Sequence, residues 1–181
     1  MSANDSFGTL SPVNLGKLSL HSLTTGASGA LVAADVVSIA QGTSHTIVPG
    51  VIAALICGVS GVSAYFKNKQ MKAALVPNDN DTESTLLRKT NLAMMVGSKL
   101  NSLIRKNAAV GVELIGTMGG VYLTAIDPNP VSAVILALAT VAGGYLTLRT
   151  GVRAYDDSEA IRRDVRAVKS SPAHMFRPSY K

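Results

Sequence analysis

Two acidic residues are the most chemically suggestive feature of the chain, because each interrupts an otherwise apolar stretch. Asp35 lies past the middle of the first stretch, and Glu113 lies near the start of the third. Inside a bilayer a charged carboxylate costs at least about 2.5 to 3.5 kcal/mol unless it is paired, hydrated or protonated. The two acids therefore either line an ion or proton path, or are satisfied by hydrogen bonds or by a partner subunit. If their stretches pack together, we expect the acids to face each other.

Residue patterns typical of catalysis do not occur in the sequence. It has no glycine-rich phosphate loop, HExxH, CxxC or GxSxG motif, and His21, His45 and His174 are scattered along the chain. Cys57 is the single cysteine and is expected to pack as a small apolar group. We therefore predict no catalytic residues, no metal site and no cofactor, and interpret the protein as a non-enzyme.

Four apolar stretches must position the two acids: Thr24 to Gln41, Ile47 to Phe66, Ala108 to Ile126 and Val131 to Leu148. Each is about long enough to cross a hydrocarbon core of about 30 Å as a helix. A soluble helical domain is the alternative, since the apolar content is 47% and the mean hydropathy only +0.28. The second stretch has no ionisable side chain except Cys57 and Tyr65, which favours a membrane protein.

The predicted fold is an all-α polytopic membrane protein with four transmembrane helices arranged as two hairpins. Val51 to Leu55 resembles Val134 to Leu138, so the hairpins are a possible tandem repeat. The expected segments are a polar N-terminal tail (1–23), a first transmembrane hairpin (24–66) and a basic central segment with an amphipathic helix (67–107). A second transmembrane hairpin (108–148) and a basic C-terminal helix with an extended tail (149–181) follow.

Basic residues are strongly segregated along the chain. All 17 lysines and arginines lie outside the apolar stretches, and the short connections between stretches one and two and between three and four contain none. Positive charge is retained on the cytoplasmic side of multi-pass proteins. Both termini and the central segment are therefore predicted to face the cytoplasm or its equivalent.

The central segment is predicted to form a basic amphipathic helix over residues 82–107. Its apolar face would comprise Leu86, Thr90, Ala93, Gly97, Leu100 and Ile104. Such a helix lies on anionic lipid, docks on a partner, or extends a transmembrane helix. The residues expected to contact lipid or a partner are Arg88, Lys89, Lys99, Arg105 and Lys106. No aromatic residues are interleaved with them as in a base-stacking surface, so nucleic acid is not predicted as a partner.

Small residues spaced four apart are expected to let the helices approach closely. The pairs are Gly116 with Gly120, Ala54 with Gly58, and Ser60 with Ala64. They either pack within the bundle or form a dedicated oligomerisation face.

These features predict a non-catalytic structural or assembly subunit of a larger membrane complex or of an internally enveloped virion. Its partners would be the lipid bilayer and other protein subunits or further copies of itself, with no small-molecule substrate identified. Losses of assembly would follow removal of residues 1–22 or 170–181. The alternative is a small channel, holin-like pore or proton-coupled carrier that uses Asp35 and Glu113.

Overall fold

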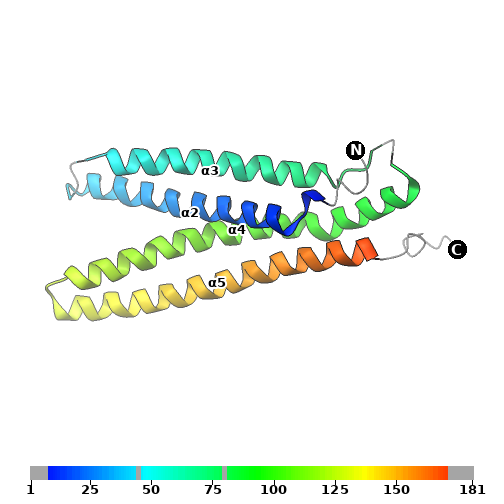
Figure 1. The fold of residues 1–181 in the computed structure, drawn as a ribbon. Helices are drawn as coiled ribbons and strands as arrows, with labels where there is room; N and C mark the ends of the chain where they lie inside the picture. Colours follow the sequence, from blue (N-terminus) through cyan, green and yellow to red (C-terminus); the bar gives the residue numbers. More distant parts are fainter. Residues whose placement is uncertain (1–7, 44–45, 79–80, 171–181) are drawn as a thin grey trace.

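The computed structural model describes residues 8–43, 46–78 and 81–170, which form four long helices (Figure 1). They are α2 (Pro12–Ala40), α3 (Val48–Ala73), α4 (Glu83–Ile126) and α5 (Pro130–Ser170). All four are long and apolar enough to cross a membrane. The predicted all-helical, multi-pass membrane class is therefore confirmed at this level.

The first helix begins well before the first apolar stretch. Ser11 is its N-cap, and the Ser11 hydroxyl oxygen accepts a hydrogen bond from the Asn14 backbone N–H at 3.4 Å. Pro12 follows as the first helical residue, where its missing N–H costs nothing. Residues 12–23, expected to be part of a polar tail, thus belong to α2.

Helices α4 and α5 are much longer than a bilayer requires. They contain 44 and 41 residues, which correspond to about 66 and about 62 Å of helix, against about 30 Å of hydrocarbon. Each therefore joins an apolar half to a charged half without a break. The basic central segment is not a separate helix, because residues 67–73 end α3 and residues 83–107 form the first half of α4.

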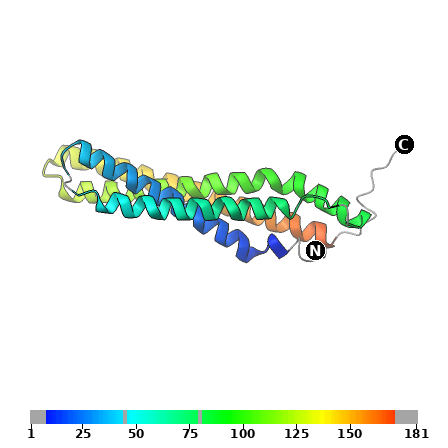
Figure 2. The ribbon, with the colours of Figure 1, turned by 90° about the horizontal axis from the view of Figure 1, so that it is seen from above.

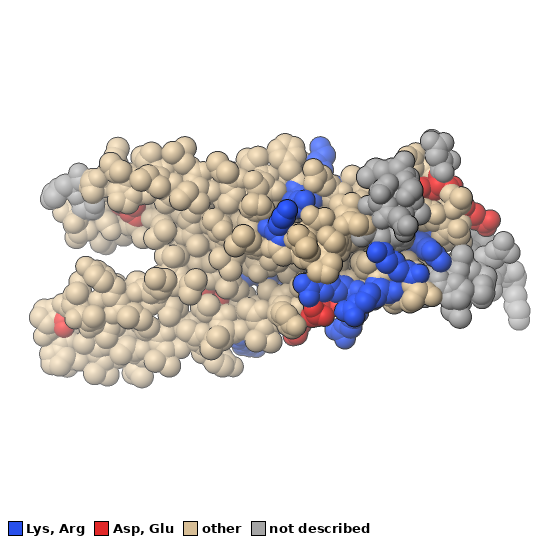
Figure 3. Space-filling model, viewed as in Figure 1, with Lys and Arg blue, Asp and Glu red and all other residues tan. Residues whose placement is uncertain are grey.

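The helices form an elongated bundle and all run along its long axis (Figures 1 and 2). Helix α2 packs along α3, α4 packs along α5, and contacts between α2 and α4 join the two pairs. Lysines and arginines gather over one half of the visible face, whereas the two pairs separate at the opposite, apolar end (Figure 3). The arrangement into two hairpins of repeated sequence stays a prediction.

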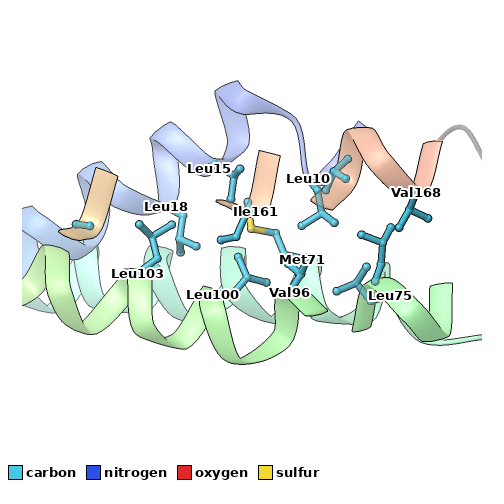
Figure 4. Close-up of a cluster of buried hydrophobic side chains, with 14 residues drawn as sticks. Leu10, Leu15, Leu18, Met71, Leu75, Val96, Leu100, Leu103, Ile161 and Val168 are labelled. Atoms are coloured by element: carbon cyan, nitrogen blue, oxygen red, sulfur yellow. The ribbon is translucent and has the colours of Figure 1, made fainter. Parts of the chain in front are cut away.

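The hydrophobic core lies at the charged end, with side chains from all four helices (Figure 4). Its fully buried members include Leu10, Leu15, Leu18, Met71, Leu92, Val96, Leu100, Leu103 and Ile161. The most apolar windows of α2, α3, α4 and α5, by contrast, are only 6, 22, 6 and 0% buried inside the protein. The charged end is thus built like a water-soluble bundle, and the apolar end exposes its side chains.

The buried face of α4 agrees with the predicted one only in part: Leu100 is buried and Ala93 and Ile104 pack against the core, as predicted, but two other positions differ. Leu92, Val96 and Leu100 are fully buried, whereas Leu86 and Thr90 are exposed. Both sets have helical spacing, so the sequence period fits either face. The tertiary contacts select the face that meets α2 and α5, and the prediction for Leu86 and Thr90 was wrong.

Candidate functional site

A ladder of polar contacts joins the charged halves of α4 and α5. Lys106 Nζ lies 2.7 Å from Asp157 Oδ2, and Lys99 forms the same type of ion pair with Asp164. A step of seven residues along α4 matches a step of seven in the reverse direction along α5. Two helical turns bring a residue back to nearly the same face, so these ion pairs recur along one antiparallel seam.

Glu113 occupies the next position of this ladder, at the start of the apolar half. Its facing residue is Thr150, whose hydroxyl donates a hydrogen bond to Glu113 Oε1 at 3.2 Å. Within the described residues, the Glu113 Oε2 atom is buried and has no hydrogen-bond partner. The ladder therefore changes from lysine–aspartate pairs to a carboxylate with one neutral donor.

A groove of about 330 Å³ extends from Glu113 between the apolar halves of α4 and α5. Beyond Glu113, two glycine–threonine contacts cross the seam in opposite directions. A Cβ at Gly120 would overlap the Thr140 hydroxyl, and one at Gly143 would lie 3.0 Å from the Thr117 hydroxyl. Both hydroxyls donate to carbonyls of their own helix, so they are satisfied without water.

Asp35 is held in a different place, beside the N-terminal turn of α3. A Cβ at Gly50 would overlap the Asp35 carboxylate, so glycine at this position lets the carboxylate rest against α3. A carboxylate at a helix N-terminus is favoured by the helix dipole. Asp35 thus contacts α3 and Glu113 contacts α5, and the expectation that the acids face each other was wrong.

The tightest helix contact is the crossing of α2 and α4. A Cβ at Gly26 would overlap the backbone of Ala108, and a Cβ at Gly111 would overlap the backbone of Leu23 and Ala27. The crossing lies beside a polar contact between α2 and α3, in which the Thr25 hydroxyl donates to Ser60 Oγ at 3.0 Å. It joins the two helix pairs just before they separate.

The small residues singled out in the sequence divide into two groups. Ser60 and Ala64 are buried, and Gly120 receives a threonine from α5. Gly58 and Gly116 face open space, because a Cβ added at either would have no neighbouring atom within 4 Å, and Ala54 is exposed. Gly116 lines the groove between α4 and α5, and Ala54 and Gly58 lie on an exposed face of α3, so packing of these three residues within the bundle stays a prediction.

Three of the five basic residues assigned to a lipid or partner surface are engaged inside the protein. Lys99 and Lys106 pair with α5, and Lys89 is buried in an ion pair of 2.7 Å with Asp81. Arg88 is half-buried, and Arg105 is exposed. Lys99 and Lys106 pair with acids of α5, whereas Asp81, the partner of Lys89, lies in the central segment itself. Contact of the five basic residues with lipid or a partner stays a prediction.

The sequence contained a signal for the ladder that the periodicity of the separate segments did not reveal. Lys99, Lys106 and Glu113 are spaced by seven residues, as are Thr150, Asp157 and Asp164. The repeat crosses from the polar into the apolar half of each helix, so neither half alone shows it. The Gly26 and Gly111 crossing has no comparable signal, because the chain contains 16 glycines.

The described part of the chain contains no group of three or more His, Cys, Asp or Glu side chains that could hold a metal ion. Its four membrane-length helices define a multi-pass helical membrane protein. Comparison with family models, curated proteins and solved structures gave no match to this chain.

The Asp157 ion pair makes a testable prediction about acid stability. Desolvation opposes ionisation of Asp157, but hydrogen bonds from Lys106 and Ser102 and the charges of Lys106 and Lys99 hold its pKa below the usual value of 3.8. The pair therefore stabilises the fold above that value and is lost as pH falls through the lower folded pKa. We expect Asp157→Asn to cost about 1 kcal/mol at neutral pH. This cost should disappear as pH falls from above 3.8 through the lower folded pKa of Asp157.

The measurement is denaturant unfolding of the purified protein in detergent across this pH range. Asp156→Asn is the matched control, since the neighbouring Asp156 is exposed and forms none of the ladder's ion pairs. An equal loss in both variants would show that net charge, and not the Lys106 pair, sets the effect.

Proposed function

We propose that the protein is a non-catalytic structural or assembly subunit of a larger membrane complex or of an internally enveloped virion, with its basic end on the cytoplasmic side. The observation that carries this proposal is the uneven distribution of buried residues. The charged end has a complete hydrophobic core, whereas at most 22% of any apolar window is buried. The molecule is thus well packed at one end and presents uncovered helix faces at the other.

The open small residues indicate where partner helices would pack. Gly58 and Gly116 have no neighbour within 4 Å of a Cβ position, and Ala54 lies one turn from Gly58 on the same exposed face of α3. In lipid, helices associate through small residues that let backbones approach. These positions therefore support a face that is covered by partner helices over packing within one chain.

The proposal is tested by gentle detergent extraction from the native source, followed by native mass spectrometry. We expect a stoichiometric complex that contains unrelated subunits. Gly58→Leu should abolish the complex without lowering the unfolding temperature, because a partner helix would clash with leucine whereas lipid would not. Recovery of the wild-type chain as a lone monomer or as a symmetric ring of itself would contradict the proposal.

Gly16→Leu is the matched control for this experiment. Gly16 also has no atom within 4 Å of a Cβ position, but it lies on the charged half of α2, outside the apolar stretches. Removal of residues 1–22 is a poor test, although it was the expected one. It would delete the buried Leu10, Leu15 and Leu18 and so destroy the core. Residues 171–181 lie outside the described residues, and their removal remains a valid test.

A specific observation supports the second candidate, a small pore or proton-coupled carrier. Glu113 keeps one carboxylate oxygen buried without a hydrogen-bond partner in the described part of the chain. An intramembrane acid of this kind is typical of ion and proton pathways. The same carboxylate lines the groove between α4 and α5.

This candidate predicts proton flux into vesicles that contain the purified protein, measured with an internal pH-sensitive dye. Glu113→Gln should then reduce flux to the level of protein-free vesicles, because the amide keeps the Thr150 hydrogen bond but cannot exchange a proton. Asp35→Asn tests the other acid. A wild-type flux no greater than that of empty vesicles would exclude this function for the isolated chain.

A further inference from the structure

A crevice of about 430 Å³ opens between α2, α3 and α4 where the charged and apolar halves meet. Helix α3 contributes Gly61, Ala64, Tyr65 and Asn68, and α4 contributes Asn101, Ile104, Arg105 and Ala108, while Ser22 and Thr25 of α2 complete the lining. None of these residues belongs to the ladder between α4 and α5. The crevice is thus a separate site.

Its polar end holds two groups that lack partners. Arg105 is exposed and forms no ion pair with any residue that the structure describes. The Asn68 Oδ1 atom is buried and accepts no hydrogen bond from the described residues. A ligand that satisfies both must combine an anion, for the guanidinium, with a hydrogen-bond donor, for the amide oxygen.

Two further polar groups of the lining already have hydrogen-bond partners. Asn101 Oδ1 accepts a hydrogen bond of 2.8 Å from Lys72 Nζ, which places a second positive charge beside the helix face of Arg105. The Ser22 hydroxyl donates to the Leu18 carbonyl at 2.8 Å. The crevice therefore has a net positive polar end and no acidic side chain in its lining.

The other end of the crevice is lined mainly by small apolar residues. Gly61, Ala64, Ile104 and Ala108 line it, and three of these residues are glycine or alanine, so the space is not filled by large side chains. The adjoining α3 surface presents Tyr65 and Phe66, with ring centroids 5.6 Å apart and both side chains exposed. Exposed aromatic residues between apolar and basic segments are typical of the headgroup level of a bilayer.

We propose that this crevice binds one anionic glycerophospholipid whose headgroup carries a free hydroxyl, with phosphatidylglycerol as the simplest example. The phosphate contacts Arg105, the headgroup hydroxyl donates to Asn68 Oδ1, and an acyl chain follows the small residues of α3 and α4. The binding of this lipid does not depend on the assembly function proposed above.

The test is native mass spectrometry of the purified protein in detergent, titrated with phosphatidylglycerol, with phosphatidylcholine of the same chains, and with glycerol phosphate. We expect one bound phosphatidylglycerol, at least tenfold weaker binding of phosphatidylcholine, and no binding of glycerol phosphate. Arg105→Gln should weaken phosphatidylglycerol binding about tenfold, as expected for a lost hydrogen bond to a charged group.

Arg153→Gln is the matched control, because Arg153 is an exposed arginine on α5 outside the crevice. It should change the affinity less than about twofold, as a distant surface charge does. Asn68→Asp is a second variant if Arg105→Gln lowers the unfolding temperature, since a carboxylate there would repel the phosphate. Equal losses for Arg105→Gln and Arg153→Gln, or equal binding of the two lipids, would overturn the proposal. Binding of glycerol phosphate as tight as that of the lipid would instead identify a simple anion site and also overturn it.

Discussion

Replacing Gly111 by alanine is expected to destabilise the protein by about 3 kcal/mol, the upper part of the range for overpacking. A methyl group at this position would lie 2.6 Å from the Ala27 backbone nitrogen and 3.2 Å from the Gly26 carbonyl carbon, and would overlap the Leu23 carbonyl oxygen. These are backbone atoms, which cannot rotate away as a flexible side chain can. The substitution must therefore push α2 from α4 and weaken the contact that joins the two helix pairs.

Gly116→Ala is the matched control for this prediction, about one and a half turns further along α4. No atom lies within 4 Å of its Cβ position, so alanine should be neutral or stabilise the helix by up to about 1 kcal/mol. The measurement is denaturant unfolding in detergent, followed by circular dichroism. Equal stabilities of the two variants would mean that α2 and α4 do not cross at Gly111.

Truncation of Leu100 to alanine is expected to cost about 3 kcal/mol, within the range for buried leucines. Leu100 is fully buried at the charged end, in the cluster formed by all four helices. Removing its side-chain atoms leaves a cavity among the four helices. The same unfolding experiment measures this loss.

Leu138→Ala provides the contrast, because Leu138 is 67% exposed in the apolar half of α5. The side chain makes few contacts inside the chain, so we expect a change below about 0.5 kcal/mol in detergent. A large loss of unfolding free energy in Leu138→Ala together with a small loss in Leu100→Ala would contradict a core at the charged end. If a partner helix covers this face in the assembled complex, Leu138→Ala should destabilise that complex.

The two acids were evident from the sequence as interruptions of apolar stretches, but their surroundings were not. Asp35 rests against Gly50 of α3, and Glu113 accepts a hydrogen bond from Thr150 of α5. Both partners are uncharged and lie on a different helix from the acid. No local pattern around either acid therefore points to its partner.

The partners of the basic residues were not evident from the sequence either. Their segregation predicted which half of each helix is polar, and in Figure 3 they gather over one half of the molecule. The sequence could not say that Lys99 and Lys106 are neutralised by acids of α5 while Arg105 forms no ion pair with the described residues. Pairing depends on the register of two helices, which is set by contacts along their whole length.

By itself, the sequence determined the four helices, because the length and hydropathy of a helix that can span a membrane are properties of a continuous segment. For the same reason, α4 ends at Ile126, where the third apolar stretch was predicted to end, and α5 begins at Pro130, one residue before the predicted start of the fourth stretch. Only the tertiary structure decided that the core lies at the charged end, that α2 and α4 cross at Gly26 and Gly111, and that Gly58 and Gly116 remain open. These features depend on distances between helices, and helical periodicity leaves the choice of packed face undetermined until the helices meet.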